Sequence, residues 1–397
     1  GKQRTGGVRM IYLDNAATTL RKPPQVIDAV ARAMGSFGNS ARGTHEGALT
    51  ASRTIYDTRC KLAALFGCPR PDHVAFTANS TEALNIAISG LLAPGDHVLS
   101  TDLEHNSVLR PLYREMERGV SVSFLPADRK GCIDYADFDR LLQTNTKAVI
   151  CTAGSNLTGN LLDLTRIGAF CAAHGLLFVV DASQTAGVFP IDLRAQHISV
   201  LCFTGHKSLM GPQGTGGIVL REDLAEKLTP LLAGGTGSMS HTEFMPDFLP
   251  DRLEPGTMNR PGLAGLHAAL DFLQETGLDT IRAHELALTK HFLAGLAPMQ
   301  AENRIKIFGL PGIEGRAGVV SIQPVHQDPA EVAASLDERF GIATRVGLHC
   351  APAAHQTLGT FPTGTIRFSF GFFNTEADVD AALAALDILT KEAHHGL

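Results

Sequence analysis

Cys202-Phe203-Thr204-Gly205-His206-Lys207 ends an apolar run that begins at Ile198, and a glycine-rich stretch at 211–217 follows it. A lysine at the end of a buried strand is unusual, because burying its charge is costly. When a lysine is buried, it can lose its proton and become an amine nucleophile. Earlier in the chain, the apolar run 178–180 ends in the carboxylate of Asp181. An amine and a carboxylate at two strand ends indicate a shared functional rim.

Short apolar runs alternate with amphipathic segments on both sides of these residues. Strands are expected at 73–76, 97–101, 120–125, 147–152, 176–180, 198–203 and 215–220, and helices at 80–92, 135–143, 164–174 and 224–232. This alternation is typical of an α/β protein with a mostly parallel, seven-stranded sheet covered by helices. Ligands of such sheets bind beyond the carboxyl ends of the strands, which places Asp181 and Lys207 on the ligand rim.

The pattern changes near residue 262. Helices are expected at 263–275, 279–296, 329–340 and 375–389, and strands at 304–308, 318–323, 343–346 and 365–370. A chain of 397 residues is long enough for two domains. We predict an N-terminal segment at 1–24 that joins the small domain, a large domain at 25–262, and a small α+β domain at 263–397 that carries Cys350 and Arg367.

Composition excludes several classes of function. A net charge of −6 gives no reason to expect nucleic acid as a partner, and no apolar run approaches the length of a membrane span. Residues 1–9 form a polar, glycine-rich tail without the apolar core of a signal peptide, and Met10 is the expected start of structure. The seven cysteines are scattered and form no CxxC pair, so neither disulfides nor a metal site are expected. These features favour a cytoplasmic setting.

The strand-end residues fit one cofactor in particular. Pyridoxal phosphate condenses with a lysine amine, and an aspartate keeps its pyridine nitrogen protonated so that the ring can accept electrons. Lys207, Asp181 and the nearby Gln184 supply this pattern. Taken alone, a surface lysine and an unrelated core-edge aspartate are the simpler interpretation. The strand ends and the flanking Gly205-His206 favour the joint site.

Candidate residues for binding the phosphate and the ring of pyridoxal phosphate lie on the same rim. Thr77-Ala78-Asn79-Ser80-Thr81 follows a strand and opens a helix, where free backbone N–H groups bind phosphate. On its own this segment is better explained as an ordinary N-cap. Thr204 and His206 would add donors from the other side. His105 follows the strand 97–101 and could stack on a ring or move protons, although a lone loop histidine means little among 16.

The last cluster lies in the C-terminal domain. Arg367 sits inside a strand-like run, and its guanidinium fork would suit a substrate carboxylate. Cys350 lies in a loop after Arg345 and before a helix start at Pro352, where the helix terminus and nearby cations would activate a thiol. A structural thiol and a buried ion pair explain these two positions equally well.

Assembled, these motifs resemble the class V aminotransferase-like family of fold-type I pyridoxal-phosphate enzymes. Within that family they are most similar to the cysteine desulfurases and selenocysteine lyases of the SUF type (group II). The resemblance covers about 12–389. It is carried by seven stretches: Tyr12-Leu13-Asp14-Asn15-Ala16-Ala17-Thr18-Thr19, Arg42-Gly43-Thr44-His45, Ser80-Thr81-Glu82-Ala83-Leu84-Asn85, Glu104-His105-Asn106, Ser155-Asn156-Leu157-Thr158-Gly159, Asp181-Ala182-Ser183-Gln184 and Thr204-Gly205-His206-Lys207. Leu348 departs from the family, because SUF-type enzymes commonly carry a histidine there.

The resemblance implies a role for each matching residue. Lys207 would form the Schiff base with the cofactor and move the α-proton, and Cys350 would attack the substrate sulfur to form a persulfide. His105 would stack on the cofactor ring, Asp181 would pair with the pyridine nitrogen, and Gln184 would bond to the phenolic oxygen. The residues expected to bind the phosphate are Ser80, Thr81, Thr204 and His206. Gly256 and Thr257 would reach the phosphate of the partner subunit. Asn15, Ala16, Asn156, Arg345 and Arg367 are the expected substrate-binding residues.

The implied activity is that of a cysteine desulfurase, a homodimer with a composite active site that converts L-cysteine to L-alanine and passes the sulfur to an acceptor protein. A selenocysteine lyase or a cysteine/cystine C–S lyase is the alternative within the family. A dinucleotide-binding dehydrogenase would need a GxGxxG that opens a helix after the first strand, and no such unit is present. A non-catalytic scaffold or sulfur-carrier partner that keeps the fold is the remaining alternative.

Overall fold

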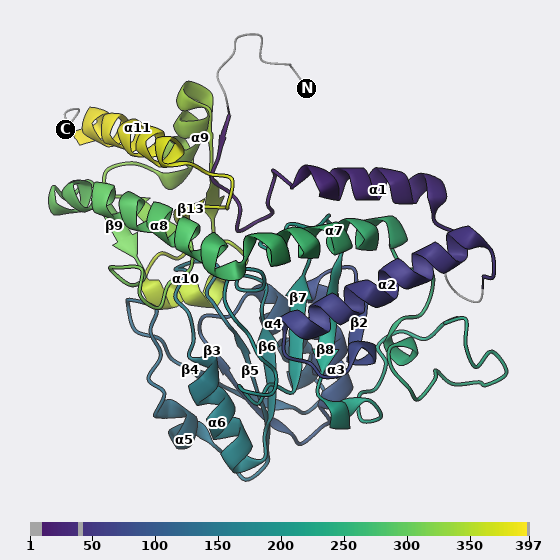
Figure 1. Cartoon of the computed structure of the whole chain (residues 1–397). Coiled ribbons are helices and arrows are strands. Elements are labelled where there is room, and N and C mark those ends of the chain that lie inside the picture. Colours follow the sequence, from purple (N-terminus) through teal and green to yellow (C-terminus); the bar gives the residue numbers. More distant parts are fainter. Residues whose placement is uncertain (1–9, 39–42, 395–397) are drawn as a thin grey trace.

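A seven-stranded sheet forms the centre of the larger part of the molecule (Figure 1). The computed structural model describes residues 10–38 and 43–394, so the predicted tail at 1–9 and Arg42 of the predicted motif lie outside the described residues. The strand order is β2-β8-β7-β6-β5-β3-β4. These strands are β2 (Val74–Thr77), β3 (His97–Thr101), β4 (Ser121–Leu125), β5 (Thr146–Thr152), β6 (Leu177–Asp181), β7 (Val200–Thr204) and β8 (Gly216–Leu220). Among these seven strands β8 alone runs opposite to the others, so it pairs antiparallel with both β2 and β7; this confirms the predicted, mostly parallel sheet.

Helices cover both faces of this sheet. One face packs against α3 (Ser80–Leu91) and α4 (Asn106–Met116). The other packs against α2 (Glu46–Leu65), α5 (Asp137–Leu141), α6 (Leu164–His174) and α7 (Arg260–Thr276), and α1 (Pro24–Ser36) lies across α7. Because both faces are buried, the strands read as continuous apolar runs rather than alternating ones.

The expected helix at 224–232 is wrong. Only the short 3-10 helix η2 (Glu222–Leu224) forms, and turns follow it. The backbone groups that a helix would have paired internally are used elsewhere: Thr229 N donates to Gly90 O at 3.1 Å, and Arg252 Nε donates to Leu228 O at 2.9 Å. Tertiary contacts therefore override the local helical pattern here.

The C-terminal part carries a four-stranded antiparallel sheet, with strand order β12-β13-β10-β9. Its strands are β9 (Ile305–Phe308), β10 (Val319–Pro324), β12 (Arg345–Gly347) and β13 (Thr365–Ser369), and its helices are α8 (Leu278–Ala301), α9 (Pro329–Phe340), α10 (Pro352–Leu358) and α11 (Glu376–His394). The N-terminal strand β1 (Ile11–Tyr12) pairs with β11 (Ile342–Ala343) in this part. The domain boundaries at 24 and 262 stay predictions, and α7 spans the second.

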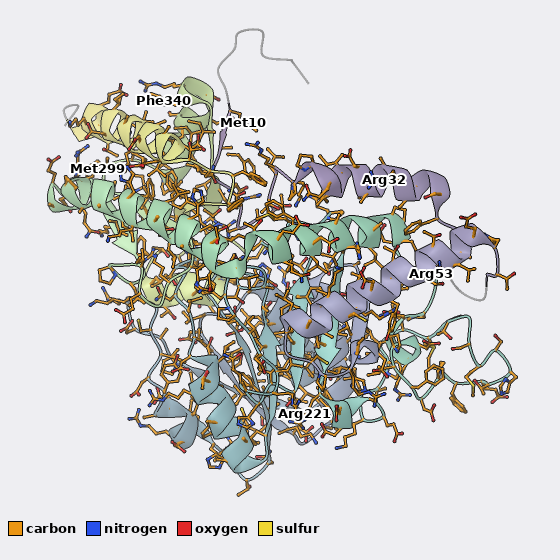
Figure 2. The ribbon with its side chains drawn as sticks, viewed as in Figure 1. Met10, Arg32, Arg53, Arg221, Met299 and Phe340 are labelled. Atoms are coloured by element: carbon orange, nitrogen blue, oxygen red, sulfur yellow. The ribbon has the colours of Figure 1, made fainter. Side chains whose placement is uncertain are left out.

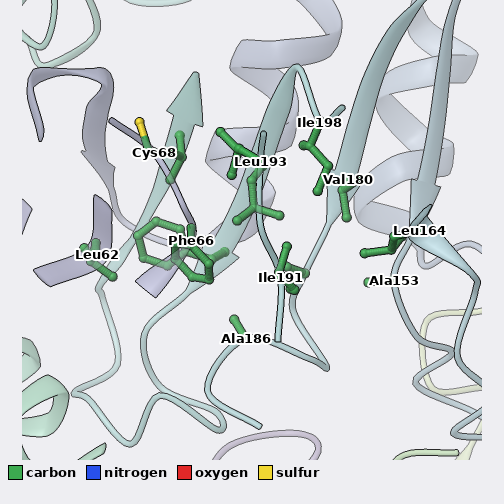
Figure 3. Packing of buried hydrophobic residues seen from close by; sticks show 14 of the residues in the cluster. Leu62, Phe66, Cys68, Ala153, Leu164, Val180, Ala186, Ile191, Leu193 and Ile198 are labelled. Atoms are coloured by element: carbon green, nitrogen blue, oxygen red, sulfur yellow. The ribbon is translucent and has the colours of Figure 1, made fainter. Parts of the chain in front are cut away.

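The core under the large sheet fixes the two strands that end at the rim (Figure 3). Val180 on β6 and Ile198 just before β7 lie in one buried cluster with Phe66 and Leu193. The rings of Phe66 and Phe203 pack with centroids 5.5 Å apart. Close packing of this kind leaves the strand ends little freedom to shift, so the residues beyond them are presented in fixed positions.

A buried ion pair ties the segment before Gly256 to the sheet. Arg59 Nη1 and Nη2 donate to the two carboxylate oxygens of Glu254 at 2.6 and 2.5 Å. Both residues are buried. Glu254 also accepts from Phe76 N at 2.6 Å, and Arg59 also donates to Val74 O at 2.7 Å. Two segments 195 positions apart are thereby joined to the edge strand β2.

We expect Arg59→Met to lower the free energy of unfolding by about 3–5 kcal/mol, because it leaves the Glu254 carboxylate buried and unpaired. Chemical denaturation followed by circular dichroism would measure the loss. Arg70→Gln is the control, since it breaks an exposed pair with Asp72 and should leave the unfolding midpoint unchanged. Equal midpoints for Arg59→Met and the parent protein would contradict the assignment.

Candidate active site

Lys207 and Asp181 lie on adjacent strand ends, as the sequence predicts. Asp181 is the last residue of β6 and pairs in register with Cys202 of β7, and Lys207 follows β7 after a turn. Burial lowers the pKa of the Lys207 amine to about 8, with a smaller contribution from the positive charge of Arg367. About a tenth of the amine is therefore neutral at pH 7, far more than for a lysine with an ordinary pKa, and the neutral amine is the form that can act as a nucleophile.

Asp181 is buried and oriented by its own turn. Ser183 donates to Asp181 Oδ1 through its backbone N–H at 3.0 Å and through its hydroxyl at 2.5 Å. No donor among the described residues reaches Oδ2, so this oxygen remains available to a protonated ring nitrogen. Gln184, in the same turn, donates through Nε2 to Ala16 O at 3.2 Å.

Two helix N-termini converge beside this turn. Asn79 caps α3 by accepting from Glu82 N at 2.9 Å, and His105 caps α4 by accepting from Ser107 N at 3.0 Å. Thr81 Oγ1 lies 2.8 Å from Ser107 Oγ, which joins the two helix starts. Free N–H groups and the positive ends of both helix dipoles make this a suitable phosphate seat.

His105 lies at the start of α4 and near the charged side chains of Asp181 and Lys207. Its Nδ1 accepts the capping bond, so the ring proton is on Nε2. Burial lowers the pKa of His105, with smaller opposing effects of Asp181 and Lys207. The His105 ring is therefore neutral near pH 7. The charges of Asp181 and Lys207 both affect its pKa, so the ring lies near these two residues.

The turn that carries Lys207 is clamped by the N-terminal segment. The carbonyl of His206 accepts from Thr19 N at 3.1 Å, from Thr19 Oγ1 at 3.0 Å and from Lys22 Nζ at 3.0 Å. His206 Nδ1 lies 3.0 Å from Thr18 Oγ1, and burial lowers the pKa of His206 to about 4. Lys22 was missed by the sequence analysis, because only the fold brings it to this turn.

The predicted carboxylate-binding residues meet around Asp14. Arg345 donates to Asp14 Oδ2 through Nε at 3.1 Å and Nη2 at 2.8 Å, and Arg367 Nη2 lies 3.3 Å from Asp14 Oδ1. Arg367 Nη1 donates to Asn156 O at 3.1 Å, while its Nε is buried without a partner among the described residues. Asp14, which the sequence analysis did not assign, holds both guanidinium groups in place.

Cys350 is exposed at the edge of this cluster on a tightly held loop. His349 and Cys350 have φ values of 52° and 55°, a left-handed conformation that costs energy for residues other than glycine. Asn156 Nδ2 donates to His349 O at 2.7 Å, and Asn106 N donates to Cys350 O at 2.7 Å. The charge of Cys350 raises the pKa of Lys207, so the two groups lie within electrostatic range of each other.

Other predicted residues lie at the margins of this site. Asn15 Nδ2 donates to Ser369 O at 3.0 Å, and Ala16 N donates to Ser369 Oγ at 2.8 Å, so both donors are already used within the chain. Ser80 Oγ lies 2.8 Å from Ser183 Oγ, and Thr204 is buried. Gly256 and Thr257 line a separate surface hollow of about 620 Å³.

Glu104, next to His105, is a third residue, after Lys22 and Asp14, to which the sequence analysis gave no role. Its carboxyl is fully buried, accepts from Thr152 N at 2.7 Å and is bonded to the hydroxyl of Thr101. Burial raises the pKa of Glu104 to about 8, and Asp181 adds to the effect. Because Glu104 is protonated and neutral near neutral pH, Asp181 has no second negative charge beside it.

The residues present fit pyridoxal phosphate. An amine with a lowered pKa, a free carboxylate oxygen on Asp181, two helix N-termini and the unpartnered Arg367 Nε lie around one rim. Within the described residues, no group of three or more histidine, cysteine, aspartate or glutamate side chains could hold a metal ion. None of the helices there is both long and apolar enough to cross a membrane.

Comparisons with known proteins agree with this chemistry. The family model for class-V aminotransferases matches residues 11–382. A probable cysteine desulfurase of Methanothermobacter thermautotrophicus is 33% identical over 93% of this chain and 92% of its own length. The apo structure of a cysteine desulfurase from Thermococcus onnurineus superposes with a TM-score of 0.89 at 31% identity, covering 96% of this chain and 95% of that one. A cysteine desulfurase structure from Escherichia coli, with an S-sulfonic acid, gives 0.86 at 28% identity over 97% and 95%.

Proposed function

The chain belongs to the class-V aminotransferase family, and from that premise we propose that it is a pyridoxal-phosphate-dependent cysteine desulfurase. It converts L-cysteine to L-alanine and keeps the sulfur as a persulfide on Cys350. The observation that carries the proposal is the position of Cys350: an exposed thiol on a rigid loop, within electrostatic range of the Lys207 amine and the Arg367 guanidinium.

Lys207 has two tasks in this mechanism. Pyridoxal phosphate, when bound, supplies an aldehyde that condenses with amines and a ring that stores the electron pair released at Cα. Lys207 Nζ would hold the cofactor, and its free amine would take the Cα proton of the substrate. Its pKa of about 8 suits both tasks, because the amine must be able to take up and give back a proton near neutral pH.

Arg367 and Asn156 orient the substrate. The unpartnered Nε of Arg367 can donate to the substrate carboxylate, while Asp14 and the carbonyl of Asn156 fix the plane of the guanidinium. Holding the carboxylate in this way aims the Cα–H bond at Lys207 and the thiol at Cys350. Such orientation accounts for a large part of the rate gain in enzyme reactions.

Cys350 takes the sulfur. Its thiolate attacks the substrate sulfur, so that an S–S bond forms while the Cβ–S bond breaks. The electron pair stays on Cβ, which takes up a proton and becomes the methyl group of alanine. The guanidinium groups of Arg345 and Arg367 interact electrostatically with the Cys350 side chain, so the sulfur lies beside the residues that would bind the substrate. An acceptor protein would then collect the sulfur from the exposed persulfide.

We further propose a homodimer in which Gly256 and Thr257 reach the phosphate of the partner subunit. Support comes from the large apolar side chains that α1, α2 and the 225–258 segment expose, among them Met34, Tyr56 and Phe244. Figure 2 shows α1 and α2, where Arg32 and Arg53 are labelled, on the outside of the molecule. Apolar patches of this kind mark contact surfaces. All seven cysteines are unpaired, which supports a cytoplasmic setting.

Product analysis tests the activity. The purified protein with pyridoxal phosphate should form alanine and, with a thiol reductant present, sulfide in equal amounts from L-cysteine. The same assay with selenocysteine and cystine separates the desulfurase from the alternative lyases. A protein that stays colourless after addition of pyridoxal phosphate, or a yellow protein that forms no alanine from cysteine, would contradict the proposal.

A further inference from the structure

Glu285 is a buried acid that the proposed mechanism does not use. It lies on α8, and only 6% of its surface is exposed. No hydrogen bond or ion pair of its carboxyl is found with any described residue. A carboxyl without any hydrogen-bond partner is strongly unfavourable in a protein interior, because its lost hydration is not replaced. The partner of this carboxyl therefore lies outside the described residues, and water is the simplest candidate.

The space for such a partner adjoins the candidate active site. Glu285 lines a small cavity of about 20 Å³ together with Gln184, Ser208 and Asn15. A water molecule needs about 10–15 Å³ of this kind of volume and two or more polar contacts. The cavity meets both conditions, and Ser208 directly follows Lys207.

The state of Glu285 follows from its surroundings. Burial alone raises the pKa of Glu285 to about 8, with no contribution from a neighbouring charge. Of the charged groups on the packed elements, Arg282 donates to Val188 O and Asp279, and the ring of His284 bonds to Asn374 O. Lys207, the residue before Ser208 in the chain, does not line the cavity. Glu285 is thus a neutral acid at pH 7 and offers one O–H donor.

The orientation of the Gln184 amide needs such a donor. Gln184 uses one N–H of Nε2 on Ala16 O, which leaves the second N–H free for the cofactor and Oε1 without a donor among the described residues. An amide whose oxygen has no partner can rotate by about 180° and exchange its donor for its acceptor. The phenolic oxygen of pyridoxal phosphate would then face Gln184 Oε1, which is an acceptor, instead of an N–H donor.

We propose that Glu285 is a positioning residue: through a water molecule in this cavity it donates to Gln184 Oε1 and fixes the Gln184 amide with its N–H toward the phenolic oxygen of pyridoxal phosphate. This rests on the proposed function. The hydrogen bonds run from the Glu285 O–H to the water and from the water to Gln184. Glu285 acts only through Gln184 and touches neither substrate nor cofactor.

The test is a pH titration of the cofactor's visible absorption band in the purified holoenzyme. Glu285→Leu should displace the midpoint of the band by about half a pH unit or more, in the same direction as Gln184→Leu, because a hydrogen bond to the ring oxygen changes its proton affinity. Glu285→Gln keeps a donor toward the water and should restore the midpoint of the parent protein. In the double variant, Glu285→Leu should add nothing to Gln184→Leu.

Further readouts separate positioning from a general loss of structure. Above pH 8 the parent protein loses the Glu285 proton and its band should move toward that of Glu285→Leu, whereas Glu285→Gln should not change. The infrared carbonyl band of a protonated carboxyl should be weaker in cofactor-free Glu285→Gln than in the cofactor-free parent. Thr58→Val is the matched control, because Thr58 is a buried helical threonine on α2 whose hydroxyl donates to Thr54 O and which does not line the cavity; it should leave the midpoint in place.

The outcomes are distinguishable. A parent protein without any cofactor band overturns the proposed function. A parent protein with the band, whose midpoint is the same in Glu285→Leu, overturns the role of Glu285 alone. If Glu285→Leu does not fold, the comparison of Glu285→Gln with the parent above pH 8 decides, and identical behaviour of those two proteins overturns the inference.

Discussion

Replacing Lys207 by alanine is expected to give a colourless protein without measurable desulfurase activity. The variant loses both the amine that holds the cofactor and the base that takes the Cα proton. The loss of a general base alone lowers turnover by about 10²–10⁴-fold, and the loss of the covalent link adds to it. Absorption spectra after dialysis and alanine formation from cysteine measure the two effects.

Lys147 provides the control for Lys207. It is an exposed lysine near the start of β5, so Lys147→Ala should keep the colour and activity of the parent protein. The Lys207 side chain makes no hydrogen bond to the described residues, so its truncation should not lower the melting temperature of the cofactor-free protein. A Lys207→Ala protein that keeps its absorption band through dialysis would falsify the assignment.

Replacing Cys350 by alanine is expected to leave the cofactor in place and remove the persulfide. The side chain is exposed and the loop is held through backbone groups, so the fold of the loop does not depend on the thiol. Without the nucleophile, the Cβ–S bond of cysteine has no acceptor for its sulfur, and alanine formation should fall by at least ~10²-fold. Mass spectrometry of the protein after incubation with cysteine should show one added sulfur atom in the parent only.

Cys132, half-buried near the surface, is the matched control, and Cys132→Ala should still gain the sulfur atom. Selenide release from selenocysteine separates two mechanisms in the Cys350 variant. If release persists while sulfide formation stops, the thiol serves sulfur transfer only. Sulfide formation at the parental rate in Cys350→Ala would show that another group takes the sulfur.

The sequence predicts the large sheet well, since each of its strands is a short apolar run bounded by turns. The expected strand at 97–101 and the expected helices at 164–174 and 329–340 coincide with β3, α6 and α9. Helix α2 is missed because several of its buried positions are small or polar, such as Ala48, Ala51, Thr58 and Arg59, and give no apolar stripe. Burial of Arg59 depends on Glu254, which local periodicity cannot reveal.

The sequence by itself determined the chemistry that short motifs carry: a lysine and an aspartate after buried strands, polar residues at helix starts, and a cysteine and an arginine in the C-terminal domain. These residues can be located from the sequence, because the end of a strand and the start of a helix depend on residues that are adjacent in the chain. Only the tertiary structure decided which groups support them. Asp14 meets Arg367 across 353 positions, Lys22 reaches His206 across 184, and Glu285 meets the turn of Gln184 at a shared cavity. Such contacts depend on how whole elements pack, and no local pattern in the chain records that packing.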